Sequence, residues 1–336
     1  MTEMIWEAPR IVPLALQSLN KFGQRRALAD VQASIDGVPL ESLVARYGSP
    51  LYVTSEQRLR ANIRRIRQAF ATRCPKVIHG WSYKTNYNGA VCSILHQEGS
   101  WAEVVSRFEY EKARMLGVPG EHILFNGPNK SRSILERAIA DGALIHVDHR
   151  DELEMIERIG QERRECVPVT LRLNFDTGFT EPWSRFGFNL ESGAARAAIA
   201  YAKASPHLRM NGLHCHIGTF ILDPRAYAAE VNVLCSLAKE IEEDGTRLSY
   251  LDMGGGLPSR NALQGIYLPP EQAVPEIEEY AEAICSAFLD GTAYRLESGE
   301  ERPTLVFESG RAVIDDAQSL ITSVVGRKAL ADGRPA

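Results

Sequence analysis

Short apolar segments alternate along this chain with segments whose apolar residues recur every three or four positions. Such alternation of strand-like and helix-like patterns is typical of a parallel sheet covered by helices. Eight repeats favour an α/β fold whose sheet closes into a (β/α)8 TIM barrel over one with an open sheet. The predicted strands cover residues 77–83, 101–105, 122–126, 143–147, 167–174, 211–216, 248–253 and 304–308.

A helix is predicted just before the first of these strands. Ser55 is a suitable N-cap residue, and an apolar stripe at helical spacing follows it: Leu59, Ile63, Ile66 and Phe70. The same periodicity predicts helices over residues 131–140, over residues 150–160, near residues 271–289, and where Tyr227, Val231, Leu234, Ala238 and Ile241 share one face.

Two stretches fall outside the alternation. Residues 27–53 contain Asp36-Gly37, a turn signal, and a predicted helix near residues 40–46. Residues 319–325 alternate in polarity and are expected to form the first strand of another sheet, whereas the tail 329–336 is expected to fray. We therefore predict three parts: an N-terminal segment (1–50) that joins or packs on a β-domain, a barrel (51–310), and the start of an incomplete C-terminal β-domain (311–336).

Composition narrows the possible functions. The net charge of -5, without a basic stripe, argues against nucleic-acid binding. No apolar run approaches the roughly 18 residues that a membrane helix needs, and the acidic N-terminus lacks the order of a secretion signal. The six cysteines are scattered without a CxxC pair. We therefore expect a cytoplasmic protein without disulfides or zinc.

Polar residues or conformationally flexible glycines follow every predicted strand, at the end where a (β/α)8 barrel carries its active site. Lys84 directly follows the C-terminal end of the first, buried strand, where a lysine can lose its proton and become an amine nucleophile. The other strand ends carry, in order, Glu103 and Ser106, Asn126–Lys130, Asp148, Arg172 and Asn174, His214–Thr219, Asp252–Gly256, and Glu308–Arg311. Their convergence indicates one site.

Two of these strand ends suggest a site for a phosphate. The three consecutive glycines, 254–256, allow close backbone approach, so that their N–H groups can surround an anion. A tight turn after the strand explains three glycines equally well. Thr219 offers a hydroxyl group to the same phosphate.

Two other strand ends carry side chains suited to binding a planar aromatic ring. His216 presents a flat side chain, and Glu308 leaves an apolar strand, where its carboxylate needs a partner. That partner is either a protonated pyridine nitrogen or an arginine such as Arg172. A metal bound by His214 and His216 is not expected, because no carboxylate lies beside them.

Seven segments occur in order within a resemblance that spans about residues 27–325: Trp81–Asn86, Glu103–Ser106, Asn126–Lys130, Ser184–Gly187, His214–Thr219, Asp252–Gly256 and Glu308–Arg311. They resemble the Y-x-V-K-A-N, D-V-V-S, N-G-N-N-K, S-K-F-G, H-C-H-I-G-S, D-L-G-G-G and E-P-G-R motifs of the fold-type III decarboxylases, which depend on pyridoxal 5'-phosphate (PLP). The resemblance is closest to the diaminopimelate decarboxylase-like members and more distant to ornithine decarboxylase.

The resemblance implies PLP as cofactor and a barrel of the alanine racemase/decarboxylase type. Lys84 would hold PLP as an internal aldimine, His216 would stack on its ring, and Glu308 would pair with the ring nitrogen, so these three are the predicted catalytic residues. Arg311 would also meet a substrate carboxylate. The predicted cofactor-binding residues are Lys84, Glu103, Arg172, His216, Thr219, Gly254, Gly255, Gly256, Glu308, Ser309, Gly310 and Arg311.

Within the family resemblance, Glu308 favours decarboxylation of an L-amino acid over racemisation, because the related racemases place an arginine at the ring nitrogen. A barrel-only PLP-binding protein, or a regulator that has lost the cofactor, is the other alternative. Residues 220–225 are more apolar than a diaminopimelate site should be, so a different amino acid, free or carrier-bound, stays open as substrate.

The family also implies a head-to-tail homodimer, in which a cysteine-centred C-E-S-x-D motif and a tyrosine of the C-terminal β-domain reach the partner's site. No such motif follows Arg311, and no cysteine follows Cys285. We therefore expect a truncated chain, a second polypeptide that supplies the missing half, or a barrel-only protein. An unpaired apolar strand at 319–325 favours the first two, because such an edge promotes aggregation.

Overall fold

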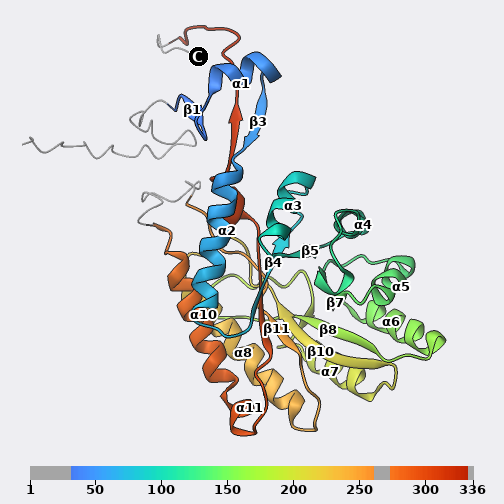
Figure 1. Ribbon diagram of the computed structural model, residues 1–336. Coiled ribbons are helices and arrows are strands. Elements are labelled where there is room, and N and C mark those ends of the chain that lie inside the picture. Colours follow the sequence, from blue (N-terminus) through green and yellow to red (C-terminus); the bar gives the residue numbers. More distant parts are fainter. Residues whose placement is uncertain (1–31, 261–272, 332–336) are drawn as a thin grey trace, which may run out of the picture.

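The computed structural model describes residues 32–260 and 273–331. Its centre is a ring of eight parallel strands, closed by the pairing of β8 with β10, so the predicted (β/α)8 barrel is confirmed (Figure 1). The strands of the ring are β4 (Val77–Ser82), β5 (Trp101–Val104), β6 (Ile123–Phe125), β7 (Leu144–Val147), β8 (Val167–Asn174), β10 (Leu208–Cys215), β11 (Tyr250–Asp252) and β12 (Thr304–Ser309). A short strand, β9 (Phe188–Asn189), pairs with the C-terminal end of β8, at Leu173 and Asn174.

Helices cover the outside of the ring: α2 (Glu56–Ala71), α3 (Gly89–Gln97), α4 (Arg107–Met115), α5 (Arg132–Ala140), α6 (Arg150–Arg163), α7 (Ala194–Ala204), α8 (Pro224–Glu242) and α10 (Ile277–Gly291). The N-cap of α2 is Ser55, whose hydroxyl accepts the Arg58 N–H at 3.1 Å, as predicted. The apolar stripe of α2 is buried, and Phe70 stacks on Phe307 of β12 with ring centroids 4.0 Å apart. Periodicity thus placed this helix correctly.

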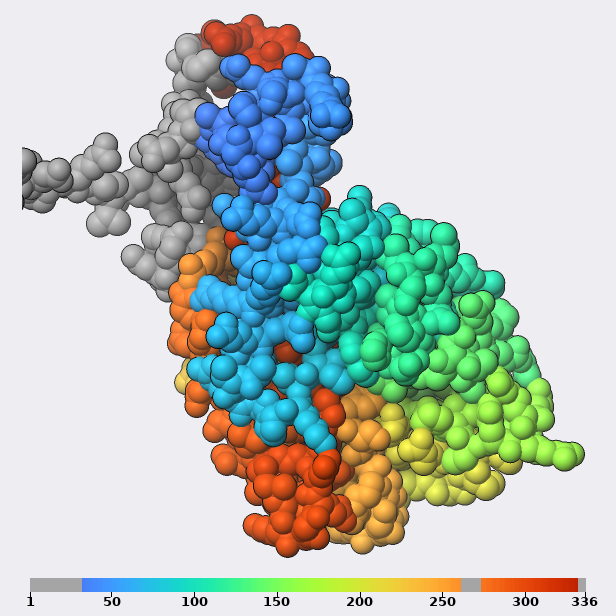
Figure 2. Space-filling model, viewed as in Figure 1, coloured from blue at the N-terminus to red at the C-terminus, as the bar shows by residue number. Residues whose placement is uncertain are grey.

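An arm stands away from the barrel (Figures 1 and 2). It consists of β3 (Leu51–Thr54) paired antiparallel with β13 (Gln318–Ile321), together with α1 (Leu40–Tyr47) and the hairpin of β1 (Ser34–Ile35) and β2 (Val38–Pro39). The predicted strand at 319–325 was too long, because its partner β3 has only four residues. β3 lies within residues 51–310, the range predicted for the barrel, but it pairs with β13 and therefore belongs to the arm.

Other boundaries also differ from the sequence pattern. The helix predicted near 271–289 begins at Ile277, where Glu276 and Glu279 form a capping box, and residues 271–272 lie outside the described residues. The same holds for residues 1–31 of the predicted N-terminal segment and 332–336 of the predicted tail. The remaining short elements are η1 (Gly120–His122), α11 (Ala293–Glu297) and α12 (Arg311–Ile314).

Two further features of the described chain concern its helices and its cysteines. Across residues 32–260 and 273–331, none of the helices combines the length and apolarity that crossing a membrane requires. All six cysteines are free thiols.

Candidate active site

A cavity of about 510 Å³ opens at the C-terminal ends of β4, β10, β11 and β12. The predicted site residues in its wall are Lys84, His216, Thr219, Gly255, Gly256, Glu308, Ser309, Gly310 and Arg311. Glu103, Arg172 and Gly254 are buried and are not part of the wall. The strand ends that looked reactive in the sequence therefore do meet at one place.

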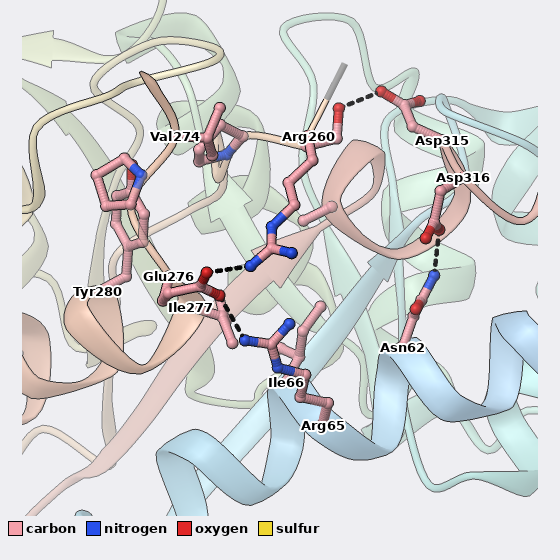
Figure 3. A pocket seen from close by; sticks show the side chains of 14 residues that line it. Asn62, Arg65, Ile66, Arg260, Val274, Glu276, Ile277, Tyr280, Asp315 and Asp316 are labelled. Carbon is pink, nitrogen blue, oxygen red and sulfur yellow. Dashed lines mark hydrogen bonds and ion pairs between the residues drawn. The ribbon is translucent and has the colours of Figure 1, made fainter. Parts of the chain in front are cut away.

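A smaller cavity of about 120 Å³ lies between α2, α10 and α12 (Figure 3). Asp315 lines both cavities, and its carboxylate accepts the Ser259 hydroxyl at 2.5 Å. The two arginines in the wall, Arg65 and Arg260, both pair with Glu276. Because these arginines in the smaller cavity are paired with a glutamate, we look for the reactive groups in the larger cavity.

Lys84 follows β4, and its side chain is 48% exposed in the cavity wall. Its Nζ donates a hydrogen bond to Oε2 of the fully buried Glu103, at 2.6 Å. Burial alone would lower the pKa of Lys84, but the charges of Glu103 and Glu308 outweigh it and raise the pKa above its usual value. In the cofactor-free protein the amine is therefore held as an ammonium beside Glu103, and it must lose a proton before it can act as a nucleophile.

Lys130 shows why a lowered pKa alone does not identify the nucleophile. Burial lowers the pKa of Lys130, which follows β6. Its ammonium donates to the carbonyls of Gly127 and His146, at 2.6 and 2.9 Å, and to Glu152 at 2.7 Å. The side chain is 0% exposed. Lys130 thus holds a loop in place, whereas Lys84 is the lysine in the cavity wall.

Glu308 lies at the end of β12 and is only 2% exposed. The side-chain amide of Asn126 donates to Glu308 at 2.7 Å and also to Glu103 at 3.1 Å. Burial, followed by the charges of Asp252 and Glu103, raises the pKa of Glu308 well above its usual value. A carboxyl group in this setting is readily ionised only when a positive group is placed against it.

His214 lies deeper in the barrel, with Nε2 3.8 Å from Oε1 of Glu308. Together with His146 and Asp252 these two form a buried group in which one nitrogen or oxygen atom from each residue lies within 4.8 Å of the other three. The expectation that no carboxylate lies beside His214 is therefore wrong. The strand order explains the difference: β11 pairs with β10 and β12 pairs with β11, so the barrel interior brings Asp252 and Glu308 close to His214 although they lie much later in the sequence.

His216, directly after β10, is held in one orientation and one charge state. Its Nδ1 accepts the backbone N–H of Gly255 at 3.0 Å, so a neutral ring carries its proton on Nε2. Burial, helped by Lys84 and Arg172, lowers the pKa of His216 to about 3. Trp183 packs edge-on against the ring, with centroids 6.2 Å apart. A fixed, neutral and flat imidazole suits stacking on an aromatic ligand.

The glycine run after β11 is more constrained than its sequence suggests. Gly254 donates its N–H to Asp252 at 2.8 Å, and the Gly255 N–H is taken by His216. Within the described chain, Gly256 is therefore the one of the three whose N–H has no protein acceptor. Its φ is +94°, and a Cβ there would come 2.3 Å from the Gly218 carbonyl oxygen. Only glycine fits this close approach.

The remaining predicted residues lie at the edge of the site or behind it. Arg172 has Nη1 3.7 Å from Asp148, so the alternative ion pair with Glu308 is not formed. The Ser309 hydroxyl is hydrogen bonded to Nε2 of His79 at 2.7 Å and is therefore directed away from the cavity. Arg311 begins α12, and its side chain is 46% exposed. Its Nη1 lies 3.7 Å from Oδ2 of Asp315, so an anionic group at the mouth of the cavity has to compete with that carboxylate.

The sequence model of the pyridoxal-binding domain of pyridoxal-dependent decarboxylases matches residues 57–315. The chain belongs to this decarboxylase family. Its cofactor is accordingly pyridoxal phosphate, and its reaction class is amino-acid decarboxylation.

Similar proteins include diaminopimelate decarboxylases from Archaeoglobus fulgidus and Methanocaldococcus jannaschii. The first is 33% identical over 303 residues, which are 87% of this chain and 67% of that protein. The second is 29% identical over 312 residues, 88% of this chain and 68% of that protein. The crystal structure of the M. jannaschii decarboxylase has a TM-score of 0.79 and covers 89% of this chain and 69% of its own. The chain thus spans about two thirds of the length of these relatives.

The cavity of this decarboxylase fits pyridoxal phosphate. Gly256 lies in the cavity wall with a positive φ, and its N–H has no acceptor within the described chain, so it can donate to a phosphate oxygen. The raised pKa of Glu308 marks a carboxyl group whose ionised form requires a cationic neighbour, as a protonated pyridine nitrogen would be. The amine of Lys84 lies in the same wall.

Sequence reasoning missed several residues around the site. Ser82, Thr85, Trp183, Leu257 and Asp315 line the cavity but were not assigned a role. Ser82 and Thr85 lie inside the motif Trp81–Asn86, and Trp183, Leu257 and Asp315 stand one to four residues from another motif, which is the signal that could have found them. Asn126 was noticed only as part of a motif, because its contacts with two carboxylates depend on the barrel closing.

Replacing Gly256 with alanine should weaken cofactor binding and destabilise this decarboxylase by roughly 2–4 kcal/mol, because both the positive φ and the Gly218 carbonyl oppose a Cβ. Gly245 is a matched control, since its φ is +92° with nothing within 4 Å of a Cβ. Gly245→Ala should cost only about 1–2 kcal/mol. Urea unfolding and PLP titration measure both. Equal losses in the two variants would show that close approach at Gly256 is unimportant.

Proposed function

We propose that this chain decarboxylates an amino acid on pyridoxal phosphate through Lys84, His216 and Glu308, with diaminopimelate as the first substrate to test. The relatives named above support diaminopimelate. The apolar character of residues 220–225 supports testing other amino acids beside it. The observation that carries the proposal is the buried Glu308 carboxyl in the same cavity wall as Lys84.

Bound PLP supplies an electron-accepting ring conjugated to the substrate Cα. Glu308 would hold a proton on the ring nitrogen by placing its carboxylate there, and so strengthen electron withdrawal as the bond to CO2 breaks. His216, neutral with its proton on Nε2, would cover one face of the ring and keep water from it. Gly256 would bind the phosphate through its N–H, with help from Thr219 and Gly310.

Lys84 would bind the cofactor aldehyde through its amine, which must first lose a proton. In the free protein Glu103 accepts a hydrogen bond from the ammonium and keeps it near the site. Arg311, half-exposed at the mouth, would bind a substrate carboxylate or the phosphate.

Decarboxylation and racemisation can be separated in one experiment. The PLP-loaded protein is incubated with diaminopimelate and a panel of L-amino acids, while CO2 release and loss of optical rotation are followed together. We expect CO2 and an equal amount of amine product, because Glu308 favours full electron withdrawal by the ring. Racemisation without CO2 would favour the alternative of an amino-acid racemase.

Replacing Glu103 with glutamine should move the pH profile of cofactor capture to lower pH. Only the uncharged amine attacks an aldehyde. The Glu103 charge raises the pKa of Lys84 and burial lowers it, so removing the charge leaves more uncharged amine at a given pH. Stopped-flow absorbance after mixing with PLP measures the profile. Glu111→Gln, an exposed change on α4, should leave it in place. A shift to higher pH would reverse the assigned role of Glu103.

We also propose that the protein works in the cytoplasm as a homodimer. The six free cysteines support a reducing compartment. The family resemblance supports a dimer whose partner contributes to the site. Sedimentation of the PLP-loaded protein would give its mass in solution, and a concentration-independent mass of one chain would exclude the dimer.

A further inference from the structure

A buried chain of hydrogen bonds leads from the barrel interior to the two carboxylates of the site. It joins Thr170 of β8, Tyr250 of β11, His146 of β7 and Asn126, which follows β6. Their exposed fractions are 1%, 4%, 0% and 3%, respectively. The function proposed above uses none of these side chains, although the last of them contacts both Glu103 and Glu308.

The direction of each hydrogen bond in this chain follows from the chemistry of its ends. Although burial opposes it, the charge and hydrogen bond of Lys84 hold the pKa of Glu103 below its usual value, so Glu103 is ionised and only accepts. Asn126 must therefore turn its amide nitrogen toward Glu103 at 3.1 Å, and the same nitrogen lies 2.7 Å from Glu308. The Asn126 carbonyl oxygen then faces His146 Nδ1 at 2.7 Å and needs a donor there. His146 must therefore carry a proton on Nδ1.

The second nitrogen of His146 completes the argument. Burial lowers the pKa of His146 well below its usual value, so the ring is neutral and holds one proton. With that proton on Nδ1, Nε2 accepts from the Tyr250 hydroxyl at 3.0 Å. The Tyr250 oxygen in turn accepts from Thr170 at 2.5 Å. Each hydrogen bond then has one donor and one acceptor. With the proton on Nε2 instead, Nδ1 of His146 and the carbonyl oxygen of Asn126 would face each other as two acceptors.

We propose that Asn126, oriented by the Nδ1–H tautomer of His146, is a positioning residue that holds Glu308 against the cofactor ring nitrogen and Glu103 against Lys84. This inference rests on the proposed function of Glu308. One amide binds both carboxylates, so it fixes their separation and offsets their repulsion in a buried site. The Tyr250 hydroxyl acts indirectly: it determines the tautomer of His146, and that tautomer determines the orientation of the Asn126 amide.

The tautomer itself can be measured without the cofactor. Protein labelled with ¹⁵N at histidine gives two-bond ¹H–¹⁵N correlations that separate the two neutral tautomers and the cation, and His146→Gln assigns the signal. We expect His146 as the neutral Nδ1–H form. An Nε2–H ring or an imidazolium would overturn the inference, whatever the fate of the proposed function.

Cofactor binding tests the consequence of that tautomer. Tyr250→Phe leaves His146 Nε2 without its donor, and we expect PLP to bind about 10-fold more weakly, with a changed ¹⁵N shift of the bound pyridine nitrogen. Asn126→Ala should weaken binding by about 10–100-fold. Tyr110→Phe is the matched control, because Tyr110 is also fully buried and its hydroxyl donates to Asp141, which lies outside the cavity wall.

The outcomes separate the two proposals. An unchanged pyridine-nitrogen shift in folded Tyr250→Phe and Asn126→Ala would overturn the positioning role while leaving Glu308 in place. A wild-type pyridine nitrogen whose shift does not respond to Glu308→Gln would instead remove the proposed function of Glu308. Should Asn126→Ala fail to fold, Tyr250→Phe and the tautomer measurement still decide the matter.

Discussion

Lys84→Ala should reduce amino-acid decarboxylation by about 10³-fold or more, since the variant lacks the amine that binds the cofactor aldehyde. The PLP-loaded wild-type protein should be yellow, and the variant should lose this colour. Lys84 is the lysine in the cavity wall, so no neighbouring amine in that wall can replace it. Initial rates of CO2 release and the visible absorption spectrum measure the two effects.

Lys76→Ala is the matched control for this change. Lys76 stands at the opposite end of β4 from Lys84, exposed and paired with Glu301. Its loss should leave the rate and the colour within about twofold of wild type, because exposed ion pairs contribute little. A Lys84→Ala protein that stays yellow and active would place the cofactor on another lysine.

Glu308→Gln should lower kcat by about 10²–10³-fold with little change in KM. Glutamine keeps the shape and can keep the hydrogen bond with Asn126, but it cannot carry the negative charge that stabilises a protonated ring nitrogen. The loss is therefore expected mainly in the step where the substrate's carboxylate leaves. Steady-state kinetics of CO2 release separates kcat from KM.

Glu230→Gln is the appropriate control for Glu308. Glu230 is also fully buried, on α8, and burial raises its pKa well above its usual value. Burial therefore favours its uncharged carboxyl form, which glutamine imitates. We expect its kcat within about twofold of wild type. Equal kcat values for the two variants would mean that the charge of Glu308 does not contribute.

Most of the fold could be predicted from the sequence, because it depends on local patterns. Apolar runs marked all eight barrel strands, and Ser55 with its following stripe marked α2. The failures occurred where a partner element decides the outcome. The strand at 319–325 ends at Ile321 because β3 is short, and β10 begins at Leu208, earlier than predicted, because it pairs with β8 from Val167 onward.

The site was predictable only in part, for a related reason. Residue types at strand ends identified Lys84, His216 and Glu308, since the parallel barrel brings such ends together. The charge state of Lys84 was not predictable, because it depends on Glu103 and Glu308 approaching from other strands. Likewise, the hydrogen bonds of Asn126 join strands that lie far apart in the sequence.

The central claim, that Lys84 carries the cofactor, is tested most directly by chemical trapping. The PLP-loaded protein is reduced with borohydride and digested, and the peptides are analysed by mass spectrometry. We expect one pyridoxyl group per chain, on the peptide that contains Lys84. A pyridoxyl group on Lys130, the buried lysine with a lowered pKa, or on no lysine at all would contradict the assignment.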